Sequence, residues 1–163
     1  MGKVLINGKE GNEFTVSENE SVNIEILPAD GYKIESVKID GVESVDKFAD
    51  GHYTVNGIEA DMNVEVLFTR IMLECYVHYE PSECNVTLQV DGEPSTSAIV
   101  PYGAHWRIDI STRAYKVSVT VNGEVIPLEG SGFYCFEVEK VTEDMDVTVT
   151  VSYTHLTLPT TSR

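Results

Sequence analysis

The sequence predicts an all-β protein made of two tandem small β-modules arranged end to end, each a β-sandwich or a β-grasp-like unit. Apolar and polar residues alternate along short stretches, which is typical of strands with one buried face. Asx-Gly pairs separate these stretches and suit the positive φ angles of tight turns. The whole pattern then occurs again about 83 positions later, which indicates a repeated folding unit.

Three aligned segments carry the repeat. VSENESVNIEI at 16–26 aligns without a gap on VPYGAHWRIDI at 100–110, and IEADMNVEV from Ile58 aligns on VTEDMDVTV from Val141. YKIESVKIDG from Tyr32 matches YKVSVTVNG from Tyr115 with one deletion. Residue types shared by two copies of a module are more often scaffold than site.

The expected strands follow from period-two alternation. Their apolar positions are Val22, Ile24 and Ile26; Val37 and Ile39; Val64, Val66 and Phe68; Trp106, Ile108 and Ile110; Val117, Val119 and Val121; Val147 and Val149. Stretches 73–78 and 86–90 are expected to form a hairpin that turns at Pro81-Ser82. That register places Cys75 opposite Leu88 and so disfavours a Cys75–Cys84 bond.

The boundary between the modules is expected near Thr69-Arg70, so that residues 1–70 form module 1 and residues 71–150 form module 2. Residues 85–90 align with residues 1–6, which leaves the stretch from Ile71 to Tyr79 without a counterpart in the first copy. Module 1 is therefore expected to lack its opening strand.

The end of the sequence departs from the repeat. VSYTHLTLPT, from Val151 onward, resembles the translation of a transposase end joined to a sequencing adapter. We interpret residues 151–163 as a non-native tail, although residues 151–153 could extend a strand.

Composition bounds the possible partners. The 163 residues are 42% hydrophobic, which suits two thin cores, and they carry a net charge of −16. Nucleic acids and anionic membrane surfaces need a positive patch, so neither is an expected partner. No apolar run is long enough to insert into a membrane, and the first residues do not begin a signal peptide.

The segments GYKIESVKIDGVE and GHYTVNGIEADMNVEVLFT resemble the repeat of long bacterial cell-surface proteins, the divergent relatives of the internalin-type B-repeat. The resemblance covers residues 1–150. Module 2 departs from the pattern at Ala114-Tyr115, in its shorter hairpin, and at Glu139-Lys140 where module 1 has Asn56-Gly57. The resemblance implies a secreted or wall-attached protein made of many such modules, with no catalytic residues to transfer to this chain.

Aromatic and basic residues found only in module 2 are the candidate ligand-binding residues, because an array places specificity where the scaffold does not repeat. They are Tyr76, His78, Tyr79, Tyr102, His105 and Arg107, with His105 and Arg107 expected one strand away from the others. A glycan or a host surface protein is the expected ligand. The chain's one tryptophan, Trp106, is expected in the core beside its alternating partners, and Tyr32 and Tyr115 are expected to pack.

Catalysis and bound cofactors are not expected. The histidines lack metal-ligand spacing, and Cys135 has no identifiable histidine partner. The sequence has no dedicated metal-binding loop. Asp61 and Asp144 each precede a closing strand, and whether a weak calcium site exists there is left undecided by the sequence. Whether Cys75, Cys84 and Cys135 are free is also open.

The sequence therefore favours structural modules: a spacer or adhesive stalk of an extracellular bacterial surface protein, located at the cell surface or wall, whose partners are the adjacent repeat modules. The alternative is a glycan- or host-protein-binding module that uses the aromatics unique to module 2. An enzyme is not expected.

Overall fold

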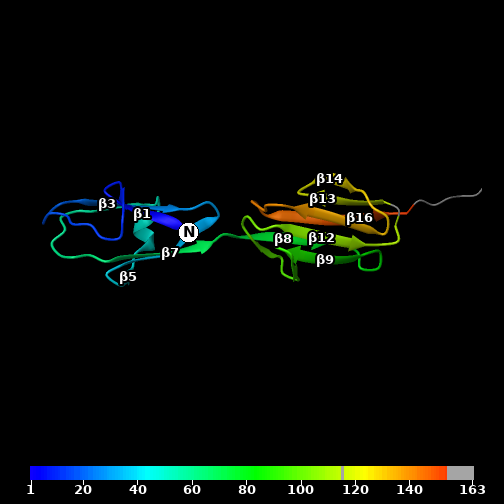
Figure 1. Cartoon of the computed structure of the whole chain (residues 1–163), viewed down its shortest axis with the longest axis horizontal. Helices are drawn as coiled ribbons and strands as arrows, with labels where there is room; N and C mark the ends of the chain where they lie inside the picture. The colour runs from blue at the N-terminus through cyan, green and yellow to red at the C-terminus, as the bar shows by residue number, and fades with distance from the viewer. Residues whose placement is uncertain (115, 154–163) are drawn as a thin grey trace, which may run out of the picture. The chain divides into compact units, whose positions relative to one another are not determined.

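The computed structural model describes residues 1–114 and 116–153 and is all-β, as predicted. The chain divides into two compact units, Met1–Ile71 (unit 1) and Met72–Arg163 (unit 2) (Figure 1). Tyr115 and residues 154–163 of the expected tail lie outside the described residues, whereas Val151 and Ser152 belong to the last strand. No helix in the described part of the chain is long and apolar enough to span a membrane.

Unit 1 contains two sheets. One has the order β2-β1-β3-β6, formed by Lys9–Glu10, Gly2–Ile6, Val22–Pro28 and His52–Val55. The other has the order β5-β4-β7, formed by Val42–Glu43, Tyr32–Ile39 and Val64–Arg70. A short 3-10 helix, η1 (Val45–Phe48), was not expected from the sequence and buries Phe48 in the core.

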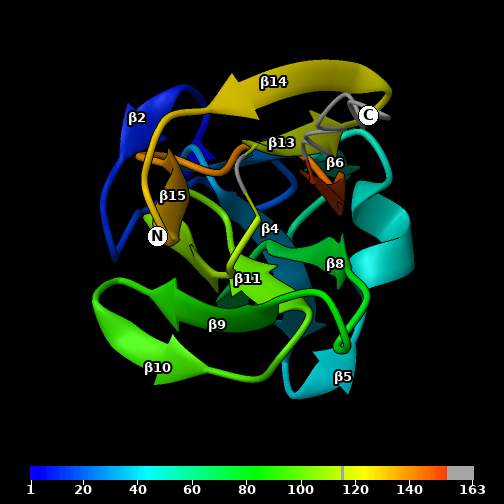
Figure 2. The ribbon, with the colours of Figure 1, turned by 90° about the vertical axis from the view of Figure 1, so that its right-hand side faces the viewer.

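Unit 2 contains the same two sheets with additions. The first has the order β10-β9-β12-β15, formed by Glu93–Ser95, Asn85–Val90, Trp106–Ser111 and Phe133–Val138. The second has the order β11-β8-β16-β13-β14, formed by Ile99–Pro101, Met72–His78, Met145–Ser152, Lys116–Val121 and Glu124–Leu128. The β9–β10 and β13–β14 hairpins, one from each sheet, lie at the bottom and top of Figure 2.

Each core lies between two sheets, so the units are β-sandwiches rather than β-grasp folds. In unit 1, Ile24 of β3 and Val37 of β4 are fully buried in one cluster. In unit 2, Ile108 of β12 and Val147 of β16 are fully buried. Trp106 has 0% exposure, which confirms that it belongs to the core.

Backbone hydrogen bonds show which residues of the two units are equivalent. In unit 1, Asn19 N–H donates to Ile58 O, and Ile58 N–H donates to Glu20 O. In unit 2, Gly103 N–H donates to Val141 O, and Val141 N–H donates to Ala104 O. These bonds reproduce the sequence alignment, so the buried residues Val22 and Trp106 occupy equivalent positions, as expected.

The one-residue deletion between the copies corresponds to a β-bulge. The β4–β7 ladder pairs Ile34 with Phe68 and then Ser36 with Leu67, so Glu35 is the extra residue. The corresponding β13–β16 ladder runs without a shift from Lys116–Ser152 to Val121–Val147. An extra residue in one strand is accommodated as a bulge because the flanking side chains then keep their faces.

Four turn residues extend the ladders with their side chains. In unit 1 the backbone N–H of Asn7 donates to Asn23 O, and Asn23 N–H donates back to Asn7 Oδ1 at 2.8 Å. Asp40 with Asn63, Asp91 with His105, and Asn122 with Asp146 make the same reciprocal pair. All four turn residues have positive φ, which Asn and Asp adopt more readily than other residues with a side chain.

The first ladder differs between the units by two positions. Asn7 donates to Asn23, and its equivalent Asp91 donates to His105. In the sequence alignment, however, the equivalent of Asn23 is Arg107, two residues after His105. A shift of two residues leaves the same side chains facing the core, because the side-chain period of a strand is two. The units therefore share a strand order but not every register.

The expected hairpin of 73–78 with 86–90 is wrong. Strand β8 pairs with β11 and, in parallel, with β16, whereas β9 pairs with β10 and β12 in the other sheet. Cys75 and Leu88 therefore do not face each other across a ladder. The six-residue connection from Tyr79 to Cys84 crosses between sheets instead of closing a tight turn.

Candidate functional site

The six candidate residues do not form one site. Tyr76 and His78 lie on the outer face of β8, because Leu73 and Cys75 of that strand face the core. Arg107 lies on the outer face of β12, which belongs to the other sheet of the sandwich, and His105 directly precedes that strand. The expectation that these pairs are one strand apart is wrong, since the core of unit 2 lies between them.

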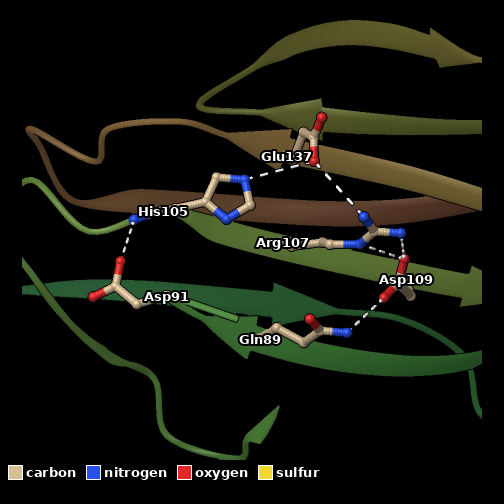
Figure 3. Close-up of polar contacts among 6 residues, drawn as sticks. All are labelled: Gln89, Asp91, His105, Arg107, Asp109 and Glu137. Atoms are coloured by element: carbon tan, nitrogen blue, oxygen red, sulfur yellow. Dashed lines mark hydrogen bonds and ion pairs between the residues drawn. The ribbon is translucent and has the colours of Figure 1, made fainter. Parts of the chain in front are cut away.

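A polar cluster covers the outer face of β12 (Figure 3). Arg107 is at its centre and binds Asp109 on its own strand through Nε at 2.9 Å and Nη2 at 2.8 Å. Asp109 also accepts a hydrogen bond from Gln89 Nε2 of β9 at 3.1 Å. Glu137 of β15 lies 3.5 Å from His105 Nε2 and 3.9 Å from Arg107 Nη1. We call these five residues, Gln89, His105, Arg107, Asp109 and Glu137, the β12-face cluster.

In the β12-face cluster, the charge of Arg107 is neutralised by the carboxylates beside it. The hydrogen bond to Asp109 is the largest cause that raises the pKa of Arg107, and the charges of Asp109 and Glu137 act in the same direction. Both sides of the guanidinium fork already face carboxylates, so an anionic ligand would have to displace them. Exposed ion pairs of this kind contribute little to the stability of a fold.

The outer face of β8 is acidic. Tyr76 Oη donates to Glu74 Oε2 at 3.3 Å, and the charge of Glu74 is the main cause that raises the pKa of Tyr76. His78 Nε2 lies 3.1 Å from Asp146 Oδ1 on the neighbouring strand β16. The exposed rings thus stand among carboxylates, an arrangement suited to sugar hydroxyls or to basic side chains rather than to anions.

The remaining two candidates lie in connections. Tyr102 follows β11, and the ammonium of Lys140 lies 5.6 Å from its ring centroid. Tyr79 is exposed directly after β8. Neither residue takes part in the hydrogen bonds and ion pairs that define the β12-face cluster.

The equivalent face of unit 1 has different chemistry. Asn23 stands where unit 2 has Arg107, and its Oδ1 accepts a 3.4 Å bond from Thr54 Oγ1. Glu25 stands where unit 2 has Asp109 and lies 3.9 Å from His52. The two units repeat the backbone arrangement but not the side chains on this face, which is the pattern expected of positions that are free to vary.

Cysteines and metal ligands give no second site. Cys75, Cys84 and Cys135 are free thiols, the first two buried and the third exposed. Burial raises the pKa of both Cys75 and Cys84, which makes them poor nucleophiles at neutral pH. Within residues 1–114 and 116–153, no group of three or more His, Cys, Asp or Glu side chains is arranged to hold a metal ion.

Sequence reasoning missed the partners of the candidate residues. Asp109 and Glu137 enclose Arg107, and Glu74 and Asp146 hold the β8 rings. Alternation could have placed Asp109 beside Arg107, since both are polar positions between buried residues of one strand. Partners from other strands required the sheet order.

Comparisons with models of known protein families, with curated proteins and with solved structures find no match for this chain.

Proposed function

We propose that this chain is a pair of spacer modules from an extracellular bacterial surface protein, which acts as a stalk and not as an enzyme. The observation that carries the proposal is that the same set of turn hydrogen bonds occurs in both units of the chain. Both units have the same strand order around their first sheet, and both use the reciprocal Asx pairs at the same turns. Repetition of a small module supports a role in which length and number matter more than a single site.

Three further features support a stalk. The segments GYKIESVKIDGVE and GHYTVNGIEADMNVEVLFT resemble internalin-type B-repeats, which belong to long surface proteins. Arg70 ends β7 and Met72 begins β8, so a single residue connects the last strand of unit 1 to the first strand of unit 2. The net charge of −16 favours repulsion between neighbouring chains.

Single-molecule stretching of the full chain tests the mechanical role. We expect two separate unfolding events. Each event should lengthen the chain by roughly 3.3–3.6 Å for every residue of the unit that unfolds, and both units should refold when the force is removed. A chain that unfolds at negligible force, or that does not refold, would contradict the role of a load-bearing spacer. The complete open reading frame tests the location, since a wall protein requires a secretion signal, further repeats and an anchoring signal.

The competing function is recognition of a glycan or a host surface protein, supported by the exposed Tyr76 and Tyr79. A glycan array and a binding assay on host matrix proteins test it, with Tyr76→Ala and Tyr79→Ala on the β8 side and Arg107→Ala on the β12 face. Saturable binding that only the β8-side variants abolish would replace the spacer proposal. Binding that only Arg107→Ala abolishes would assign recognition to the β12-face cluster. Absence of binding by the unmodified chain supports the spacer.

A further inference from the structure

Unit 2 contains a strand that the described residues of unit 1 do not match. Strand β8 lies between β16 and β11, parallel to the first and antiparallel to the second. In unit 1 the strand equivalent to β16 is β7, which pairs with β4 on one side and with no described strand on the other. The segment equivalent to β11, residues 15–17, is not a strand.

Burial differs at the positions that β8 covers. Val147 and Val149 of β16 are 0% and 7% exposed, whereas their equivalents Val64 and Val66 in β7 are half-buried. Val100 of β11 is 0% exposed, whereas its equivalent Val16 is half-buried. The apolar positions of unit 1 thus match those of unit 2, but their side chains are less completely buried in unit 1.

In unit 1, residues 15–17 and the start of β7 correspond to the two strands that flank β8 in unit 2. Glu20 N–H donates to Ser17 O, as Ala104 N–H donates to Pro101 O in unit 2, so residues 15–17 are held where β11 would be. Strand β16 begins at Met145, whereas β7 begins at Val64, two residues after Met62, the equivalent of Met145. The ladder is shorter in unit 1 at the place where β8 pairs with Met145 and Asp146 in unit 2.

A capping carboxylate is also in place. Asp144 Oδ1 accepts a 2.8 Å hydrogen bond from the backbone N–H of Glu74 in β8. Its equivalent in the repeat is Asp61, an exposed residue for which the described residues show no hydrogen bond. A carboxylate that caps an incoming strand in one unit is therefore conserved in type and position in the other.

The start of β1 indicates where such a strand would enter. A Cβ at Gly2 would meet the far edge of the Phe68 ring and the backbone oxygen of Leu27, which places the start of β1 beside the Phe68 side chain of β7. In unit 2 the chain leaves β8 after His78, which pairs with Thr148 of β16, and reaches β9 at Asn85. A segment leading into β1 can follow the same course along β7.

We propose that unit 1 is a strand-acceptor site: the edge of β7 beside residues 15–17 binds a β-strand with the pattern of β8, supplied by the polypeptide immediately ahead of β1. The strand runs parallel to β7, places small or aliphatic side chains over Val64 and Val16, and donates a backbone N–H to Asp61. Backbone pairing gives affinity and the alternate inward side chains give specificity, as in other cases of strand addition. The inference rests on the comparison of the two units and does not require the spacer role.

The test is a fusion in which a second copy of residues 71–84 precedes Met1 of the full chain. We expect amide exchange at residues 15–17 and 62–64, followed residue by residue by NMR under reducing conditions, to slow by about tenfold or more. The matched control carries Leu73→Asp and Cys75→Asp in the added copy only, which keeps the length but removes the inward side chains. Unchanged exchange in the fusion, or equal slowing in the control, would overturn the proposal.

Two further arms separate the occupants. Asp61→Ala in the fusion should remove part of the slowing, whereas Glu59→Ala, an exposed neighbour, should not. The unfused chain is measured at several concentrations by sedimentation and by the same amide exchange. If residues 15–17 and 62–64 become protected as a dimer forms, a second copy occupies the edge of β7 and the assignment to the preceding segment is wrong.

Discussion

Asp144 accepts a hydrogen bond through Oδ1 from the backbone N–H of Glu74, 70 positions earlier in the chain, at 2.8 Å. This contact joins the turn before β16 to β8, which lies between β11 and β16 in the second sheet of unit 2. A carboxylate fixed in this way substitutes for a ladder carbonyl where the partner strand has not yet begun.

Asp144→Ala should therefore destabilise unit 2 by about 1 kcal/mol, because it leaves the N–H of Glu74 without its partner. Asp144→Asn keeps an acceptor oxygen and should cost less. The chain has one tryptophan, Trp106, so its fluorescence during urea unfolding reports on unit 2 alone. Glu143→Ala removes an exposed neighbouring carboxylate as the control, and an equal loss in that variant would show that charge, not the hydrogen bond, is responsible.

The reciprocal Asx pair predicts a graded series at Asn122. This residue has a φ of 46° and accepts a 2.9 Å bond from Asp146 N–H. Asn122→Ala should cost about 1–2 kcal/mol, since it loses the acceptor and places a poorly suited residue in the left-handed region. Asn122→Gly should cost less, measured by urea unfolding followed at Trp106. Asn122→Asp keeps the acceptor but loses the 3.3 Å bond from Asn122 Nδ2 to Asp144 O, so its cost should also lie below that of Asn122→Ala without reaching zero. The reverse order of Gly and Ala would contradict the backbone argument.

The bulge in unit 1 predicts a pH effect at Glu43. Its carboxylate accepts bonds from Ser36 Oγ at 2.7 Å and from Val37 N–H at 3.1 Å, and the Ser36 bond is the main cause that lowers its pKa. A carboxyl with a lower pKa in the folded state stabilises that state above its unfolded pKa, and this contribution is lost as the pH falls through the folded pKa. The protection factor of the Val37 amide, which corrects for the pH dependence of intrinsic exchange, should therefore fall as the solution becomes acidic.

Glu43→Gln should remove much of that acid dependence, because the amide does not titrate. Glu35→Gln removes the same charge from the exposed bulge residue and serves as the control, which should retain the dependence. An NMR titration that follows the Glu43 side-chain carbonyl carbon should also show the lowered pKa directly. An acid dependence that survives in Glu43→Gln would assign it to other carboxyls.

Complete burial of Trp106 predicts its spectroscopic behaviour. Native emission should be blue-shifted and protected from acrylamide, and added sugars should not alter it. Trp106→Ala should cost about 3–5 kcal/mol through the cavity that it creates, measured by circular dichroism during urea unfolding. Phe133→Ala, an exposed aromatic on the adjacent strand β15, should change the stability little. Red-shifted, quenchable native emission would contradict the buried position.

The strands and turns were predictable because they depend on neighbours in sequence. Alternation identified Ile24 and Ile108 as buried, and Asx-Gly pairs marked turns whose residues do have positive φ, among them Asn7 and Asp91. The sequence showed the one-residue deletion, and the structure shows that the extra residue of unit 1, Glu35, forms a β-bulge. Of the candidate site, Arg107 lies between the buried Trp106 and Ile108 on the outer face of β12, and its partner Glu137 lies on another strand.

The sequence by itself determined that the chain is all-β and which residues of each strand face the core, because a one-residue slip would turn every apolar side chain outward. Only the tertiary structure decided that β8 pairs with β16 and not with β9, and hence that Tyr76 and Arg107 lie on opposite sheets. Strand partners are chosen by contacts between residues far apart in the chain. Alternation within a strand carries no information about which edge it will join.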